Sequence, residues 1–176
     1  MQFKSQWDFW DFQRAVHTRL RYIRTPEQEH FLSAVLTTSA SRKIPLKRGT
    51  IFWRAQLGCE WKKVQGEEDT FDVPHVYPPE RMKPLPDRAS EGRANAKGIP
   101  CLYLSTRKET AMSEVRPWIG SRISVGQFKL LRDSEIIDCS RRPSDYPFHD
   151  VEPEPEQREE VIWSCIDRAF CGTDHP

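Results

Sequence analysis

The sequence predicts a mixed α+β fold, in which a bent sheet is flanked by helices and preceded by an N-terminal helical hairpin. Over residues 1–45, apolar residues recur at the three- and four-residue steps of amphipathic helices. From residue 46 onwards, short aliphatic and aromatic runs alternate with polar connections, as strands do. A long helical pattern returns at residues 156–170. We therefore expect a hairpin extension at 1–45 and a main domain at 46–176.

The hairpin is predicted from two helical start signals. Ser5 precedes the first periodic run, and Thr25 is followed by Pro26 at the first helical position and by Gln28, which completes a capping box. Arginines along the first helix raise the alternative of a helix-turn-helix DNA reader. We favour an amphipathic hairpin packed on the main domain, because the connection lacks a turn glycine and the whole chain has a net charge of +1.

Residues 46–56 predict the first strand of the main domain. Arg54 alternates there with Trp53 and Ala55, so it lies on the opposite face of the strand from both. A guanidinium in an apolar strand is costly to bury unless it meets an anion. That anion is either a protein carboxylate or a phosphate of a ligand, which arginine binds in a bidentate manner.

Residues 57–87 show no sustained period, and five prolines fall between positions 73 and 87. We expect a long irregular excursion, because such loops are usually lids, binding loops or disordered segments. Arg81 and Lys83 bring positive charge from this excursion toward the next segment.

The segment 92–117 places an arginine, a tyrosine, a serine and a glutamate in one short unit. Residues 99–105 predict a strand with Tyr103 and Ser105 on one face. Thr106 and Glu109 then predict a capping box for a helix over residues 107–116. Glu114 lies on the edge of that helix's apolar stripe, which suits either a surface ion pair or a carboxylate at a site.

The rest of the chain supplies two strands and the late helix. Residues 122–131 predict a strand with Gly126 as a bulge, and residues 135–139 predict a shorter one. The helix at 156–170 carries acidic residues at its start and Arg168 in its last turn.

Composition excludes several classes of function. The near-neutral net charge gives no electrostatic case for direct nucleic-acid binding, and no apolar run is long enough to span a membrane. The five cysteines are irregularly spaced, so we expect reduced thiols in a cytoplasmic protein. The spacing of Cys165, Cys171 and His175 fits no zinc pattern, and we expect no metal site.

Blocks of this sequence resemble, in order, the RES domain family, which is named for an arginine, a glutamate and a serine. They read FWRA, GRANAKGIPCLYLS, AMSEVRPW, RISVGQF and EEVIWSCIDRAF, and they extend over roughly residues 46–170. The resemblance implies an ADP-ribosyltransferase-like fold that binds NAD in a cleft. It also implies a toxin that breaks down NAD and an Xre-type helix-turn-helix antitoxin that neutralises it.

Transferred by position, the family arginines match Arg54 and Arg93, the strand aromatic matches Tyr103, and the family glutamate matches Glu114. We expect Glu114 and Tyr103 to act in catalysis, and Arg54, Arg93, Tyr103 and Ser105 to bind substrate. The family serine follows the late helix on a further strand. We find no match for it in this sequence, so we expect the RES-like domain to lack its C-terminal strand.

Three functions are compatible with these residues. The chain cleaves NAD at the nicotinamide–ribose bond as a glycohydrolase or phosphorylase, or it transfers ADP-ribose to a protein, or it is a truncated, non-catalytic domain that acts through a partner. A carboxylate close to the ribose stabilises the positive charge of the transition state. Because no glycine-rich dinucleotide fingerprint is present, NAD is expected as a substrate and not as a redox cofactor.

Overall fold

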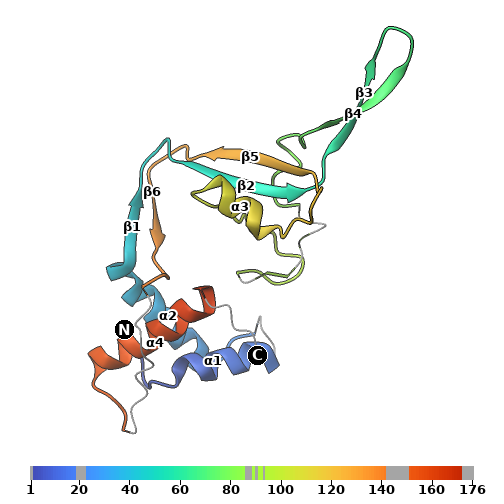
Figure 1. The fold of residues 1–176 in the computed structure, drawn as a ribbon. Helices are drawn as coiled ribbons and strands as arrows, with labels where there is room; N and C mark the ends of the chain where they lie inside the picture. Colours follow the sequence, from blue (N-terminus) through green and yellow to red (C-terminus); the bar gives the residue numbers. More distant parts are fainter. Residues whose placement is uncertain are drawn as a thin grey trace. The chain divides into compact units, whose positions relative to one another are not determined.

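The computed structural model describes residues 2–18, 23–85, 89, 91–92, 94–141 and 151–171. Within this part, helices and short sheets form a mixed α+β fold, which confirms the predicted fold class (Figure 1). The helices are α1 (Asp8–Thr18), α2 (Pro26–Thr38), the 3₁₀ turn η1 (Ser39–Arg42), α3 (Lys108–Glu114) and α4 (Pro155–Cys171). The strands are β1 (Lys43–Leu46), β2 (Ile51–Leu57), β3 (Glu60–Gln65), β4 (Thr70–His75), β5 (Ile123–Lys129) and β6 (Ser134–Ile137).

The described strands pair as three two-stranded sheets, β1 with β6, β2 with β5, and β3 with β4. Contacts divide the chain into one unit of Met1–Pro45 with Glu135–Pro176 and a second unit of Leu46–Ser134. The late helix α4 therefore groups with the N-terminal helices. The division into an extension at 1–45 and a domain at 46–176 stays a prediction.

The core of the first unit joins α2 to α4. Phe12 stacks on Phe31 with ring centroids 4.8 Å apart, and Phe3 packs on the same ring at 5.8 Å. Burying each large apolar side chain contributes about 1.5–3 kcal/mol, so this cluster stabilises the unit. Its buried members are Phe3, Phe31, Ala34, Ile162, Trp163 and Ile166.

The predicted start of α2 is confirmed. The Thr25 hydroxyl accepts the N–H of Gln28 at 3.4 Å, and the Gln28 side chain accepts the N–H of Thr25 at 2.9 Å. Pro26 occupies the first helical position, where its missing N–H costs no hydrogen bond.

A buried ion pair fixes the 3₁₀ turn to α4. Arg42 Nη1 donates to Asp167 Oδ1 at 2.7 Å and to the Asp138 carbonyl at 3.0 Å, and its guanidinium lies 4.3 Å from the ring centroid of Trp163. The Asp167 side chain is 0% exposed. Burial raises the pKa of Asp167, and the hydrogen bond and charge of Arg42 oppose that rise.

In the second unit, β2 and β5 pair antiparallel with Arg54 opposite Gly126. The expectation of one strand over residues 46–56 is corrected, because a turn separates β1 from β2. In that turn the Thr50 N–H donates to the Lys47 carbonyl at 3.1 Å, and Gly49 adopts a φ of 91°. A positive φ is accessible to glycine at little cost, so Gly49 permits the break.

The expectation that residues 57–87 are irregular is wrong for their first half, where β3 and β4 form a hairpin. Val64 pairs with Phe71, and Lys63 pairs with Asp72. Both kinds of pair stabilise antiparallel strands. The Gly66 N–H donates to the Asp69 carbonyl at 2.8 Å and closes the turn. The charges interspersed between the aromatic and branched residues hid this strand pattern in the sequence.

The strand predicted at residues 99–105 is also wrong. Only Ser105 takes part in a bridge, exchanging backbone hydrogen bonds with Trp53 at 2.7 and 2.9 Å. The apolar run before it has no ladder partner in the described part of the chain, and Leu102 and Leu104 remain partly exposed.

The helix predicted at residues 107–116 is observed as the shorter α3, but its predicted capping box is wrong. The N-cap is Arg107, with an extended backbone and no side-chain cap, instead of Thr106. The chain is still extended at Arg107, two residues after the bridge between Ser105 and Trp53, so it turns helical only at Lys108.

Candidate functional site

The site is built on the face of β2 that carries Arg54. Opposite residues of an antiparallel pair project to the same face, so Arg54 shares its face with Gly126. A Cβ added to Gly126 would lie 3.3 Å from Cε of Met82, which is buried. The predicted bulge at Gly126 is therefore wrong. The glycine is in register, and its missing side chain lets Met82 approach the sheet.

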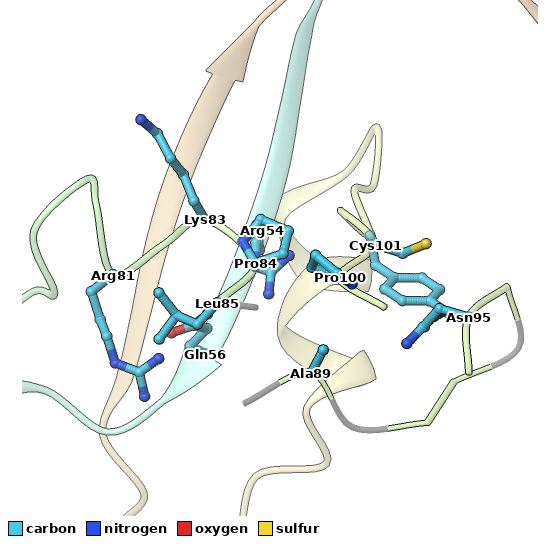
Figure 2. Close-up of a pocket in the computed structure, with 11 residues that line it drawn as sticks. Arg54, Gln56, Arg81, Lys83, Pro84, Leu85, Ala89, Asn95, Pro100 and Cys101 are labelled. Carbon is cyan, nitrogen blue, oxygen red and sulfur yellow. Dashed lines mark hydrogen bonds between the residues drawn. The ribbon is translucent and has the colours of Figure 1, made fainter. Parts of the chain in front are cut away.

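A cavity of about 150 Å³ lies beside this face, and Arg54 and Tyr103 both line it (Figure 2). Arg54, Arg81 and Lys83 bring positive charge to the cavity, and none of its described lining residues carries a carboxylate. The remaining lining residues are Gln56, Pro84, Leu85, Ala89, Asn95, Pro100 and Cys101.

Arg54 is the most unusual group of the cavity. Its Nε and Nη1 atoms are buried, and neither has a hydrogen-bond partner within the described part of the chain. Burial lowers the pKa of Arg54, and the nearby positive charge of Arg81 lowers it further. Buried donors without partners cost about 1–3 kcal/mol each. The arrangement is therefore suited to an anionic ligand that accepts these hydrogen bonds.

Tyr103 holds the loop beside the cavity. Its hydroxyl accepts the N–H of Ala94 at 3.0 Å and donates to Asn95 Oδ1 at 2.7 Å. Gly92 and Asn95 exchange backbone hydrogen bonds, and a Cβ on Gly92 would lie 2.5 Å from the Tyr103 hydroxyl oxygen. The tyrosine hydroxyl thus orders the loop, while its ring borders the cavity.

The other predicted site residues are placed differently. Glu114 lies at the C-terminal end of α3, which packs against β2; it is exposed and does not line the cavity. The Ser105 hydroxyl accepts the N–H of Arg107 at 3.2 Å, so this serine serves the start of α3. Arg93 lies outside the described residues. The structure brings Arg54 and Tyr103 together, and the approach of Glu114 to a bound ligand stays a prediction.

Sequence reasoning did not assign Gln56, Asn95, Arg81 or Lys83 to the site. Gln56 follows Arg54 by two residues, so strand alternation alone puts both on one face. The positive charges of Arg81 and Lys83 were visible in the sequence, but their approach to Arg54 depends on how Met82 packs against Gly126.

A comparison with protein-family profiles matches residues 52–170 to the RES domain. The chain belongs to the RES domain family. The RES match includes Arg54, Tyr103 and Glu114, and it begins in β2 and ends in α4. No curated protein and no solved structure matches this chain. In the described part of the RES chain, no helix combines the length and the apolar character that crossing a bilayer requires.

Proposed function

We propose that this RES protein binds NAD and cleaves the bond between its nicotinamide and ribose, as a glycohydrolase or a phosphorylase. The observation that carries the proposal is the Arg54 guanidinium beside a cavity that Tyr103 also lines, because its buried Nε and Nη1 donors have no hydrogen-bond partner among the described residues. Membership of the RES family supports NAD as the ligand. The guanidinium suits the diphosphate, because arginine binds phosphate oxygens through a planar pair of N–H donors.

In the proposed reaction, the bond between the ribose anomeric carbon and the nicotinamide nitrogen breaks. Its electron pair leaves with nicotinamide, which becomes neutral, and positive charge develops on the ribose. The Glu114 carboxylate stabilises this charge more strongly in the transition state than in the ground state. Water or phosphate then bonds to the anomeric carbon, and the proton that the nucleophile loses goes to solvent. The products are nicotinamide and either ADP-ribose or its 1″-phosphate.

Incubation with labelled NAD tests the proposal and separates its alternatives. Nicotinamide release with free or phosphorylated ADP-ribose supports the hydrolase or phosphorylase. Nicotinamide release with a labelled protein band, in place of free or phosphorylated ADP-ribose, supports the protein ADP-ribosyltransferase. If the folded protein releases no nicotinamide, with or without phosphate, this result contradicts NAD cleavage and favours the non-catalytic domain.

In the same proposal, the protein is the toxin of a toxin–antitoxin pair, neutralised by an Xre-type helix-turn-helix protein. Expression of the chain alone is expected to lower cellular NAD and arrest growth. Expression of Glu114→Gln at the same level is expected to do neither. Growth arrest by both variants with unchanged NAD would contradict this role.

A further inference from the structure

The segment that carries Arg81 and Lys83 is anchored to the sheet. Met82, between these cations, is 4% exposed and packs where Gly126 leaves room. Upstream, the Tyr77 N–H donates to the buried hydroxyl of Ser124 at 3.0 Å. Arg81 therefore lies between two anchored residues, and the exposed Lys83 directly follows the second of them.

Arg81 is positioned further by an aromatic ring. Its guanidinium lies 5.1 Å from the ring centroid of Tyr77, within the range of a cation–π contact. Gly58 makes room for this tyrosine, because a Cβ on Gly58 would collide with the Tyr77 hydroxyl. The ring therefore holds Arg81 close enough for its charge to lower the pKa of Arg54.

The positive charge of the cavity lining that the structure describes exceeds the negative charge of the diphosphate of NAD. Each phosphodiester carries one negative charge, so the diphosphate matches two of the three cations Arg54, Arg81 and Lys83. In Figure 2 Arg81 and Lys83 both lie on one side of Arg54, and their side chains point away from each other. The three cations are thus separated from one another, which fits a ligand with more than one phosphate position.

The chemistry of the lining leads to the same class of ligand. In Rossmann folds, sites that select NAD present a carboxylate to the ribose 2′-hydroxyl, whereas an arginine accommodates a 2′-phosphate, and the same charge preference applies to the ligand of this different fold. The described lining has cations and no carboxylate.

We propose that Arg81 and Lys83 make this site selective for the 2′-phosphorylated dinucleotide, NADP, over NAD. The proposal rests on the function proposed above, because it assigns the preferred substrate of the same site. The 2′-phosphate monoester adds a charge of about −1.5 to −2 at neutral pH. It supplies the acceptors that the third cation lacks when NAD is bound.

The test is to measure the binding of ADP-ribose and of its 2′-phosphate to the full chain by calorimetry. Neither ligand contains the scissile bond, so catalysis does not affect the result. We expect the wild type to bind the 2′-phosphate about tenfold more tightly, as one charge-assisted hydrogen bond provides. Arg81→Ala/Lys83→Ala should reduce this ratio to about one.

The matched control is Lys62→Ala/Lys63→Ala, which removes the same amount of charge from β3, outside the cavity lining. It should keep the tenfold ratio. Arg81→Gln/Lys83→Gln retains side-chain length and should behave like the alanine variant, so it replaces that variant if the latter does not fold. Equal affinities in the wild type, or a ratio that persists in the folded cavity variant, would overturn the proposal.

Nicotinamide release separates the two proposals. If wild-type protein prefers the 2′-phosphate but releases no nicotinamide from NAD or NADP, the phosphate subsite stands and the proposed catalysis fails. If it releases nicotinamide at the same kcat/KM from both dinucleotides, catalysis stands and the selectivity fails.

Discussion

Removing Arg42 should destabilise the first unit strongly, because it leaves a buried carboxylate without its cation. Asp167 is 0% exposed, and its Oδ2 atom is already buried without a hydrogen-bond partner among the described residues. Breaking a buried ion pair on one side costs about 3–5 kcal/mol. For a chain of this size, that loss lowers the melting temperature by about 6–20 °C. Arg42→Met retains most of the apolar length over Trp163, so the loss reports mainly on charge.

The neighbouring residue supplies a matched control. Lys43 forms an ion pair with Glu135 at 2.8 Å, but both side chains are about half exposed. Exposed pairs contribute about 0–1 kcal/mol, so Lys43→Met should change the unfolding free energy little. Urea denaturation followed by tryptophan fluorescence measures both variants at the same pH.

The loss in Arg42→Met should also depend on pH, with a definite sign. Burial raises the pKa of Asp167 above its value in the unfolded chain. Such a group favours folding most below its unfolded pKa, and this contribution is lost as pH rises through the folded pKa. Without Arg42 the folded pKa rises further, so the deficit relative to wild type should be larger at pH 7.5 than at pH 5. A deficit similar to that of Lys43→Met, or one that grows toward acid pH, would refute the reasoning.

Three further predictions concern the site and the local structure. Glu114→Gln should lower NAD turnover about a hundredfold, which corresponds to about 3 kcal/mol, and should leave the melting temperature unchanged, whereas Arg54→Ala should mainly raise the Kd for NAD. A lower melting temperature of Glu114→Gln with normal turnover per folded molecule would make Glu114 a structural ion-pair partner. Thr25→Ala should cost about 1 kcal/mol in urea denaturation, because the Gln28 N–H loses its cap; no measurable loss would show that water replaces the cap. Gly126→Val should displace Met82, because even a Cβ at this position would lie 3.3 Å from Met82 Cε. The variant should therefore bind pyrophosphate more weakly in calorimetry. Unchanged affinity in a folded variant would show that anion binding in the cavity does not depend on the Met82 contact.

Local features of the sequence determined the helices and several site residues. The capping box of Thr25 and Gln28 joins groups three residues apart, so it forms wherever that segment becomes helical. The helical period of residues 156–170 likewise predicts α4 from its own side chains. Arg54 stood out because a charge within an apolar strand requires an anion, and its buried donors have no partner in the part of the chain that the structure describes.

Only the tertiary structure decided which segments pair and which charges meet. Residues 99–105 have the composition of a strand, but a ladder needs a neighbouring backbone, and only Ser105 finds one, in Trp53. The hairpin of β3 and β4 formed instead in a segment whose charges obscured its pattern. Strand formation depends on partners distant in sequence, whereas each helix forms its hydrogen bonds within itself.

The same reason explains why the charges of the cavity could not be read from the chain alone. Arg81 approaches Arg54 because Met82 packs onto the sheet where Gly126 has no side chain, a contact between residues far apart in sequence. Arg42 meets Asp167 across 125 residues because the core between α2 and α4 holds these distant segments together. Residue type determined that these groups need partners, and packing determined which partners they found.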